Sequence, residues 1–122
     1  MDDRAQLGQA GEKHAARFLR KLGYRLVTRN YRCPMGEIDL VMLDRHVIVF
    51  VEVKTRTSDE FANPEDAVTR EKQRKLTRSA QFFLRQTRSN GRACRFDVIA
   101  ITLDGTGGMS VEHFKSAFQA RM

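Results

Sequence analysis

The spacing of hydrophobic and polar positions changes several times along the chain, and each change predicts a new element. Residues 5–22, AQLGQAGEKHAARFLRKL, place apolar side chains on one side at helical spacing, which predicts an amphipathic helix. These side chains are Leu7, Gly11, Ala15, Phe18, Leu19 and Leu22. Gly23 is a suitable C-terminal cap. Glu12 falls about 20° beyond Leu19 on a helical projection, at the edge of the apolar face.

The next part of the chain alternates with the period of a β-strand. Residues 24–31 (YRLVTRNY) predict a first strand and residues 37–43 (EIDLVML) a second, separated by a loop that contains Pro34 and Gly36. Residues 47–54 (VIVFVEVK) begin with an apolar run typical of a strand buried on both faces. Residues 44–46 form a short turn, so the second and third strands predict a hairpin.

The second half of the chain predicts a long helix followed by further strands. The helix begins at ANPEDAV, with Asn63 as its cap and Pro64 in its first turn, and runs to about Thr87. Residues 95–103 predict a strand, and MSVEHFKSAF predicts a short strand leading into a helical turn or tail. The order αβββαββ predicts an α/β fold, with a central mixed sheet flanked by helices in one domain of residues 1–122.

Composition and charge restrict the partners of such a domain. With 41% hydrophobic residues and no apolar run near 18 residues, the chain predicts a protein that does not enter membranes. Its charged N-terminus lacks the apolar segment of a signal peptide, and Cys33 and Cys94 predict two ordinary thiols, so we expect a cytoplasmic protein. The net charge is +7, and residues 70–95 carry nine basic residues against one acid, which favours nucleic acid as partner.

Part of this basic charge forms a stripe on the second predicted helix. The stripe lies roughly opposite the apolar arc and comprises Arg70, Arg74, Arg78 and Arg85, with Arg88 beyond them. Such a stripe suits the phosphate backbone of DNA, although an ordinary solvated helix face has the same pattern.

The predicted hairpin places candidate chemistry at one end. If residues 44 and 47 pair across the turn, Asp39 lies directly opposite Glu52, and Lys54 shares the face of Glu52. Two carboxylates this close favour a hard cation such as Mg²⁺ or Mn²⁺, and a lysine beside them suits a phosphate. The set predicts metal-assisted phosphodiester hydrolysis. The alternative is a same-face ion pair of little energetic consequence at a strand end.

Two resemblances extend this interpretation. Asp39 followed by VEVK resembles the D-(x)n-E-x-K signature of the PD-(D/E)XK nuclease superfamily, whose restriction-endonuclease-like core has the order αβββαβ. Archaeal Holliday-junction resolvases look most similar within it, although Ile38 stands where the superfamily name has Pro. GQAGEKHAARFLRKLGY, RNYRCPMGEIDLV, VFVEVKTR and EKQRKLTRSAQFFL together resemble a bacterial family of uncharacterised YraN-like proteins.

The superfamily resemblance implies roles for individual residues. It implies Asp39, Glu52 and the Val53 carbonyl as metal ligands, Lys54 as the catalytic lysine, Glu12 as a ligand from the first helix, and Gln73 as a further site residue on the second helix. Glu37 is a reserve ligand, although a strand-edge carboxylate beside Arg32 is the simpler interpretation. Arg56 is a candidate phosphate contact or a solvated arginine.

These observations lead to three functional hypotheses. The first is an Mg²⁺- or Mn²⁺-dependent endonuclease acting on DNA rather than RNA, on branched or single-stranded substrates, for which a homodimer would suit cleavage of two strands. The second is a non-catalytic nucleic-acid-binding protein that retains the nuclease fold. The third, a basic protein–protein adaptor, does not require the carboxylates and ranks last.

Overall fold

The computed structural model describes residues 3–57 and 68–120, with the side chains of the first helix described from Gly8 onward. The described elements follow in this order: helix α1 (Asp3–Lys21), strands β1 (Arg25–Cys33), β2 (Gly36–Asp44) and β3 (Val47–Thr57), helix α3 (Arg70–Gln86), and strands β4 (Cys94–Leu103) and β5 (Met109–Phe118). The predicted order αβββαββ is therefore confirmed.

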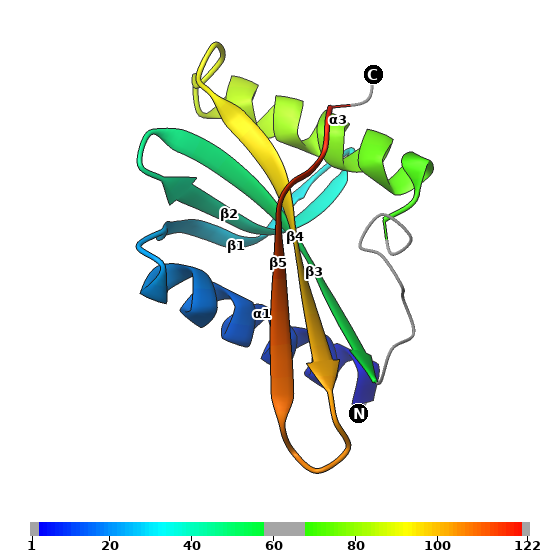
Figure 1. Ribbon diagram of the computed structural model, residues 1–122. Coiled ribbons are helices and arrows are strands. Elements are labelled where there is room, and N and C mark those ends of the chain that lie inside the picture. The colour runs from blue at the N-terminus through cyan, green and yellow to red at the C-terminus, as the bar shows by residue number, and fades with distance from the viewer. Residues whose placement is uncertain (1–2, 58–67, 121–122) are drawn as a thin grey trace.

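The strands form one five-stranded sheet in the order β1-β2-β3-β4-β5. β3 and β4 are parallel and the other neighbouring pairs are antiparallel, so the predicted mixed sheet is confirmed. Parallel neighbours need a crossover, and α3 lies between these two strands in the sequence. Figure 1 shows the two helices on opposite sides of the sheet. No helix in the described ranges is both long and apolar enough to cross a membrane.

Each helix covers a separate hydrophobic cluster. Ala15, Ala16 and Leu19 of α1 pack in one cluster with Val49 and Val51 of β3. The other cluster joins Leu76, Ala80 and Phe83 of α3 to Ile48 and Phe50 of the same strand. Successive β3 side chains thus enter opposite layers, which explains why its first half reads as an uninterrupted apolar run.

The second predicted helix begins later than its N-terminal pattern indicates. α3 starts at Arg70, and the Thr69 side chain caps it by accepting a hydrogen bond from the Lys72 backbone N–H at 3.2 Å. Thr69 has extended backbone angles, while Val68 before it is buried in the α3 cluster, so a continuous helix through these positions is wrong. The predicted cap at Asn63 lies outside the described residues.

The last predicted element is also different. Residues 109–118 form a complete strand without a helical turn. β5 pairs with β4, and a register shift opposite residues 96–98 is accompanied by a positive φ of 50° at Ser116. The Ser116 N–H donates to Asp97 Oδ1 at 3.0 Å, so a buried carboxylate on β4 holds this end of β5 in the sheet.

Leu22, predicted on the buried face of the first helix, is 56% exposed.

Asp97 belongs to a buried polar network that joins β4 to β5, to β2 and to Tyr24, which lies between α1 and β1. Its carboxylate accepts from Arg95 Nε at 3.0 Å and contacts His113 Nε2 at 2.7 Å. Arg95 also contacts Asp44 at 3.0 Å and the Tyr24 hydroxyl at 2.6 Å. The groups of this network stabilise the fold only while all of them are present, because removal of one partner leaves the others buried and unpaired.

Candidate functional site

The candidate site begins where β2 and β3 separate. Their pairing runs from Asp44 opposite Val47 to Leu40 opposite Val51, which confirms the predicted hairpin register. One further step in this register places Asp39 across from Glu52. Asp39 Oδ2 accepts a hydrogen bond from the Val53 backbone N–H at 2.8 Å, so its carboxylate is held at the point where the strands part.

Glu12 reaches this point from α1. A Cβ atom at Gly11 would collide with Thr55 Oγ1, so the absence of a side chain at Gly11 lets α1 approach β3 closely. The Glu12 carboxyl lies near the side chains of Asp39 and Asn30, and both affect its pKa. Asn30 has a left-handed φ of 49°, a conformation that Asn tolerates better than most residues. The helix, β1 and β2 therefore all contribute to the position of the Glu12 carboxyl.

The three carboxyl groups are difficult to ionise together. Burial is the largest cause that raises the pKa of Glu12 to about 7, followed by the charge of Asp39. The same two causes raise the pKa of Glu52 to about 7, although Lys72 and Lys54 act in the opposite direction. Burial also raises the pKa of Asp39. The nearby charge of Asp39 also raises the pKa of Glu12, so these two carboxyl groups disfavour ionisation together.

Two lysines approach the same carboxylate oxygen. Oε1 of Glu52 lies 3.8 Å from Lys54 Nζ and 3.8 Å from Lys72 Nζ. Glu52 as a whole is only 5% exposed. Lys54 was expected from the E-x-K spacing, whereas Lys72 was not identified from the sequence. Lys72 was missed because the helix was predicted to begin at Asn63, well before Lys72. A helix capped by Thr69 places Lys72 in its first turn.

The site opens into a cavity of about 570 Å³ between α1, β2, β3 and α3. Its lining residues are Gly8, Glu12, Glu37, Asp39, Glu52, Val53, Thr55, Arg56, Thr57 and Lys72. The structure thus brings together the four predicted metal ligands Glu12, Asp39, Glu52 and Val53. Glu37, the reserve ligand, lines the cavity, and its side chain also pairs with Arg32 Nε at 3.4 Å.

Two other predicted residues occupy different surroundings. Gln73 is buried and donates from Nε2 to the Val68 carbonyl at 3.0 Å, and it lines a separate cavity. Arg56 lines the acidic cavity but is only 8% exposed, because its guanidinium contacts Glu112 at 3.3 Å and Thr102 at 2.9 Å. Arg56 is therefore engaged within the protein rather than presented to solvent.

The predicted arginine stripe lies on the outer side of α3. Arg70, Arg74, Arg78 and Arg85 are all exposed. None of these four side chains lines the acidic cavity, and Arg70 borders the cavity of Gln73 instead. The stripe is available to a ligand, but it does not adjoin the carboxylates.

The donor types of the site are those of a hard divalent cation. Carboxylate and carbonyl oxygens are the ligands preferred by Mg²⁺ and Mn²⁺, and burial together with the charge of Asp39 raises the pKa values of Glu12 and Glu52. Across residues 3–57 and 68–120, no three His, Cys, Asp or Glu side chains stand in ready-made coordination geometry. The fit therefore rests on the type and clustering of the donors.

Comparison with known proteins identifies the family. The profile of the uncharacterised protein family UPF0102 matches residues 11–101, which include the three carboxylates and both lysines. A UPF0102 protein of Desulfosudis oleivorans is 43% identical over 122 residues, covering 100% of this chain and 97% of its own length. A UPF0102 protein of Moorella thermoacetica is 46% identical over 116 residues, covering 94% of this chain and 97% of its own. The predicted resemblance to the YraN-like family is thereby confirmed: the chain belongs to the uncharacterised protein family UPF0102.

Proposed function

We propose that this protein is a divalent-metal-dependent nuclease that hydrolyses phosphodiester bonds in DNA. The observation that carries the proposal is the convergence of Glu12, Asp39 and Glu52 in one cavity, with Lys54 and Lys72 both beside Glu52. A structural ion pair at a strand end requires neither a third carboxylate from another element nor a second lysine. The element order α1-β1-β2-β3-α3-β4 also agrees with the expected restriction-endonuclease-like core.

The residues of the site would have two roles, since some would bind a cation and others would contact a phosphate. Asp39 and Glu52, once deprotonated, would be the principal ligands, joined by the Val53 carbonyl and by Glu12 directly or through water. A bound Mg²⁺ or Mn²⁺ would polarise a phosphoryl oxygen and lower the pKa of a water molecule. Lys54 and Lys72 would stabilise negative charge that develops on the phosphate as the water oxygen bonds to phosphorus and the bond to the leaving sugar oxygen breaks.

Cleavage assays with matched variants test this proposal. Branched, single-stranded and duplex DNA, together with RNA, are incubated with the protein and Mg²⁺, Mn²⁺ or EDTA. We expect metal-dependent DNA cleavage that Asp39→Asn and Lys54→Ala each reduce by about 100-fold or more. Lys75→Ala is the control, because Lys75 is an exposed lysine of α3 that pairs only with Glu71 among the described side chains. Its activity should match that of the wild type.

A second readout does not depend on cleavage. Mg²⁺ should raise the thermal unfolding temperature of the wild type but not that of Asp39→Asn, because a ligand that binds only the folded state stabilises it. DNA binding without metal-dependent cleavage of any substrate would overturn the nuclease assignment in favour of the non-catalytic alternative. Cleavage that survives in both variants would locate the activity elsewhere.

A further inference from the structure

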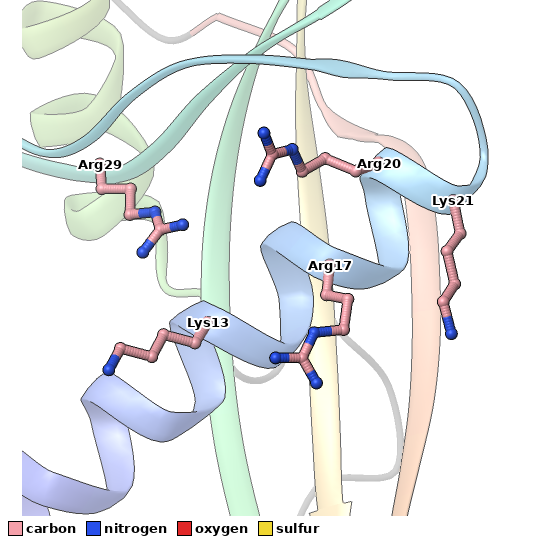
Figure 2. A pocket seen from close by; sticks show the side chains of 5 residues that line it. All are labelled: Lys13, Arg17, Arg20, Lys21 and Arg29. Atoms are coloured by element: carbon pink, nitrogen blue, oxygen red, sulfur yellow. The ribbon is translucent and has the colours of Figure 1, made fainter.

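Another hollow, of about 450 Å³, is lined by five basic side chains among the described residues. Figure 2 shows four of them spread along α1, with the fifth reaching from β1. We call this set the α1/β1 basic surface; it comprises Lys13, Arg17, Arg20, Lys21 and Arg29. None of these positions was among the residues predicted to contact nucleic acid, because the sequence is more strongly basic over residues 70–95.

The helix spacing aligns these charges in a row. Lys13, Arg17, Arg20 and Lys21 follow one another at intervals of four, three and one residues, which places them on one side of α1. From Lys13 to Lys21 the helix rises about 12 Å, at about 1.5 Å per residue. One strand of duplex DNA presents a phosphate about every 3.4 Å along its axis, so the row can face about three phosphates.

These five cations are exposed and retain their charge for a ligand. Among the ion pairs between described side chains, none involves any of them. Other basic residues near the site have acidic partners, since Arg56 contacts Glu112, and Lys54 and Lys72 both contact Glu52. A row of unpaired cations around a concave surface repels itself and attracts a polyanion.

A small third hollow shares lining residues with both the α1/β1 basic surface and the acidic cavity. It measures about 150 Å³ and is lined by Gln9, Glu12, Lys13, Arg29 and Asn30. Lys13 and Arg29 also line the basic hollow, and Glu12 also lines the acidic cavity. The small hollow therefore shares Lys13 and Arg29 with the basic hollow and Glu12 with the acidic cavity.

We propose that the α1/β1 basic surface binds the phosphate backbone of a nucleic-acid strand and leads it across Glu12 into the acidic cavity. The inference rests on the proposed function in taking nucleic acid as the polyanion. It assigns the principal phosphate contacts to α1 and β1 rather than to the arginine stripe of α3, which does not adjoin the acidic cavity. Contacts of this kind position the strand without reading its bases.

Two triple variants with equal loss of charge test the proposal. The first is Arg17→Gln/Arg20→Gln/Lys21→Gln on α1, and the matched control is Arg74→Gln/Arg78→Gln/Arg85→Gln on α3. Binding of a fluorescent 20-nucleotide single-stranded DNA is measured by anisotropy in EDTA over a series of KCl concentrations. All six side chains are exposed, so thermal unfolding should show both variants folded.

The α1 variant should bind at least about 10-fold more weakly, and the slope of log K against log[KCl] should become shallower by about 2, at about 0.7 per lost phosphate contact. The α3 variant should bind within about 3-fold of the wild type. An equal or greater loss in the α3 variant, or no loss in the α1 variant, would overturn the inference. So would DNA binding that stays intact while the α1 variant loses binding to anionic phospholipid vesicles. Because binding is measured without metal, these outcomes are separate from a failure of cleavage.

Discussion

Replacement of Glu52 by Gln tests whether the acidic site is maintained at a cost to stability. The pKa of Glu52 is raised from 4.5 to about 7, chiefly by burial and by the charge of Asp39. Between these two pH values the folded protein binds more protons than the unfolded chain, so stability falls as pH rises through this window and levels off above it. At about 1.4 kcal/mol per pH unit, the difference between these two pKa values corresponds to about 3 kcal/mol at pH 8. Gln cannot ionise and resembles the protonated acid, so it removes this loss.

The measurement is urea unfolding of the wild type and Glu52→Gln in EDTA at pH 4.5, 6 and 8. The two proteins should have similar stability at pH 4.5, whereas the variant should be more stable by about 3 kcal/mol at pH 8, despite losing its charge pairs with Lys54 and Lys72. At roughly 4 °C per kcal/mol for a chain of this size, the thermal midpoint should rise by about 12 °C. Glu71→Gln, on the exposed side of α3, is the control and should change little at any of these pH values.

A Glu52→Gln variant that is less stable than the wild type at pH 8 would refute this reasoning, because Glu52 would then be a net stabilising partner of its lysines. An equal gain at pH 4.5 and pH 8 would also refute it, since the effect would not follow ionisation. The expected result is a more stable protein that has lost a proposed metal ligand, a trade-off common at functional sites.

Two further substitutions test the supports of the site and of the sheet. Gly11→Ala should lower the unfolding free energy by about 1–3 kcal/mol, because the added Cβ would collide with Thr55. This loss should outweigh the better helix propensity of Ala. An increase in thermal stability would contradict the close approach of α1 and β3. Asp97→Asn should cost about 3–5 kcal/mol at pH 7, because it leaves Arg95 and His113 without their buried partner. The pKa of Asp97 is lowered, because its bonds to His113 and Arg95 outweigh the opposing effect of burial, so its stabilisation is present above the ordinary Asp pKa near 4 and is lost as pH falls through the lower folded value. Urea unfolding should therefore show a smaller difference at pH 3 than at pH 7, and an equal difference at both would contradict the assignment.

Much of the candidate site follows from local sequence. The period-two alternation in β2 and β3 and the short turn between them determine which residues face one another, because a slip of one residue would turn buried side chains toward solvent. This is why the placement of Asp39 opposite Glu52 can be deduced from the residue pattern alone. The position of Glu12 at the edge of the apolar face of α1 follows in the same way from helical periodicity.

The positions that could not be predicted depend on groups distant in the sequence. α3 starts after Thr69, later than expected, and Val68 before it is buried in the core. With this start, Lys72 of the first turn pairs with Glu52. The C-terminal pattern gave no sign of a full strand, since β5 is held in part by the buried carboxylate of Asp97. The exposed appearance of Arg56 in the sequence was misleading because its partners, Thr102 and Glu112, lie on other strands.

The sequence by itself determined the order of the elements, the register of the hairpin and the identity of the acidic and basic side chains at its open end. Periodicity and turn chemistry act between neighbours in the chain, so they can be read without the fold. Only the tertiary structure decided which charged side chains have partners of opposite charge. Such pairing depends on distances of a few ångströms between separate elements, and among the described ion pairs none involves the α1/β1 basic surface.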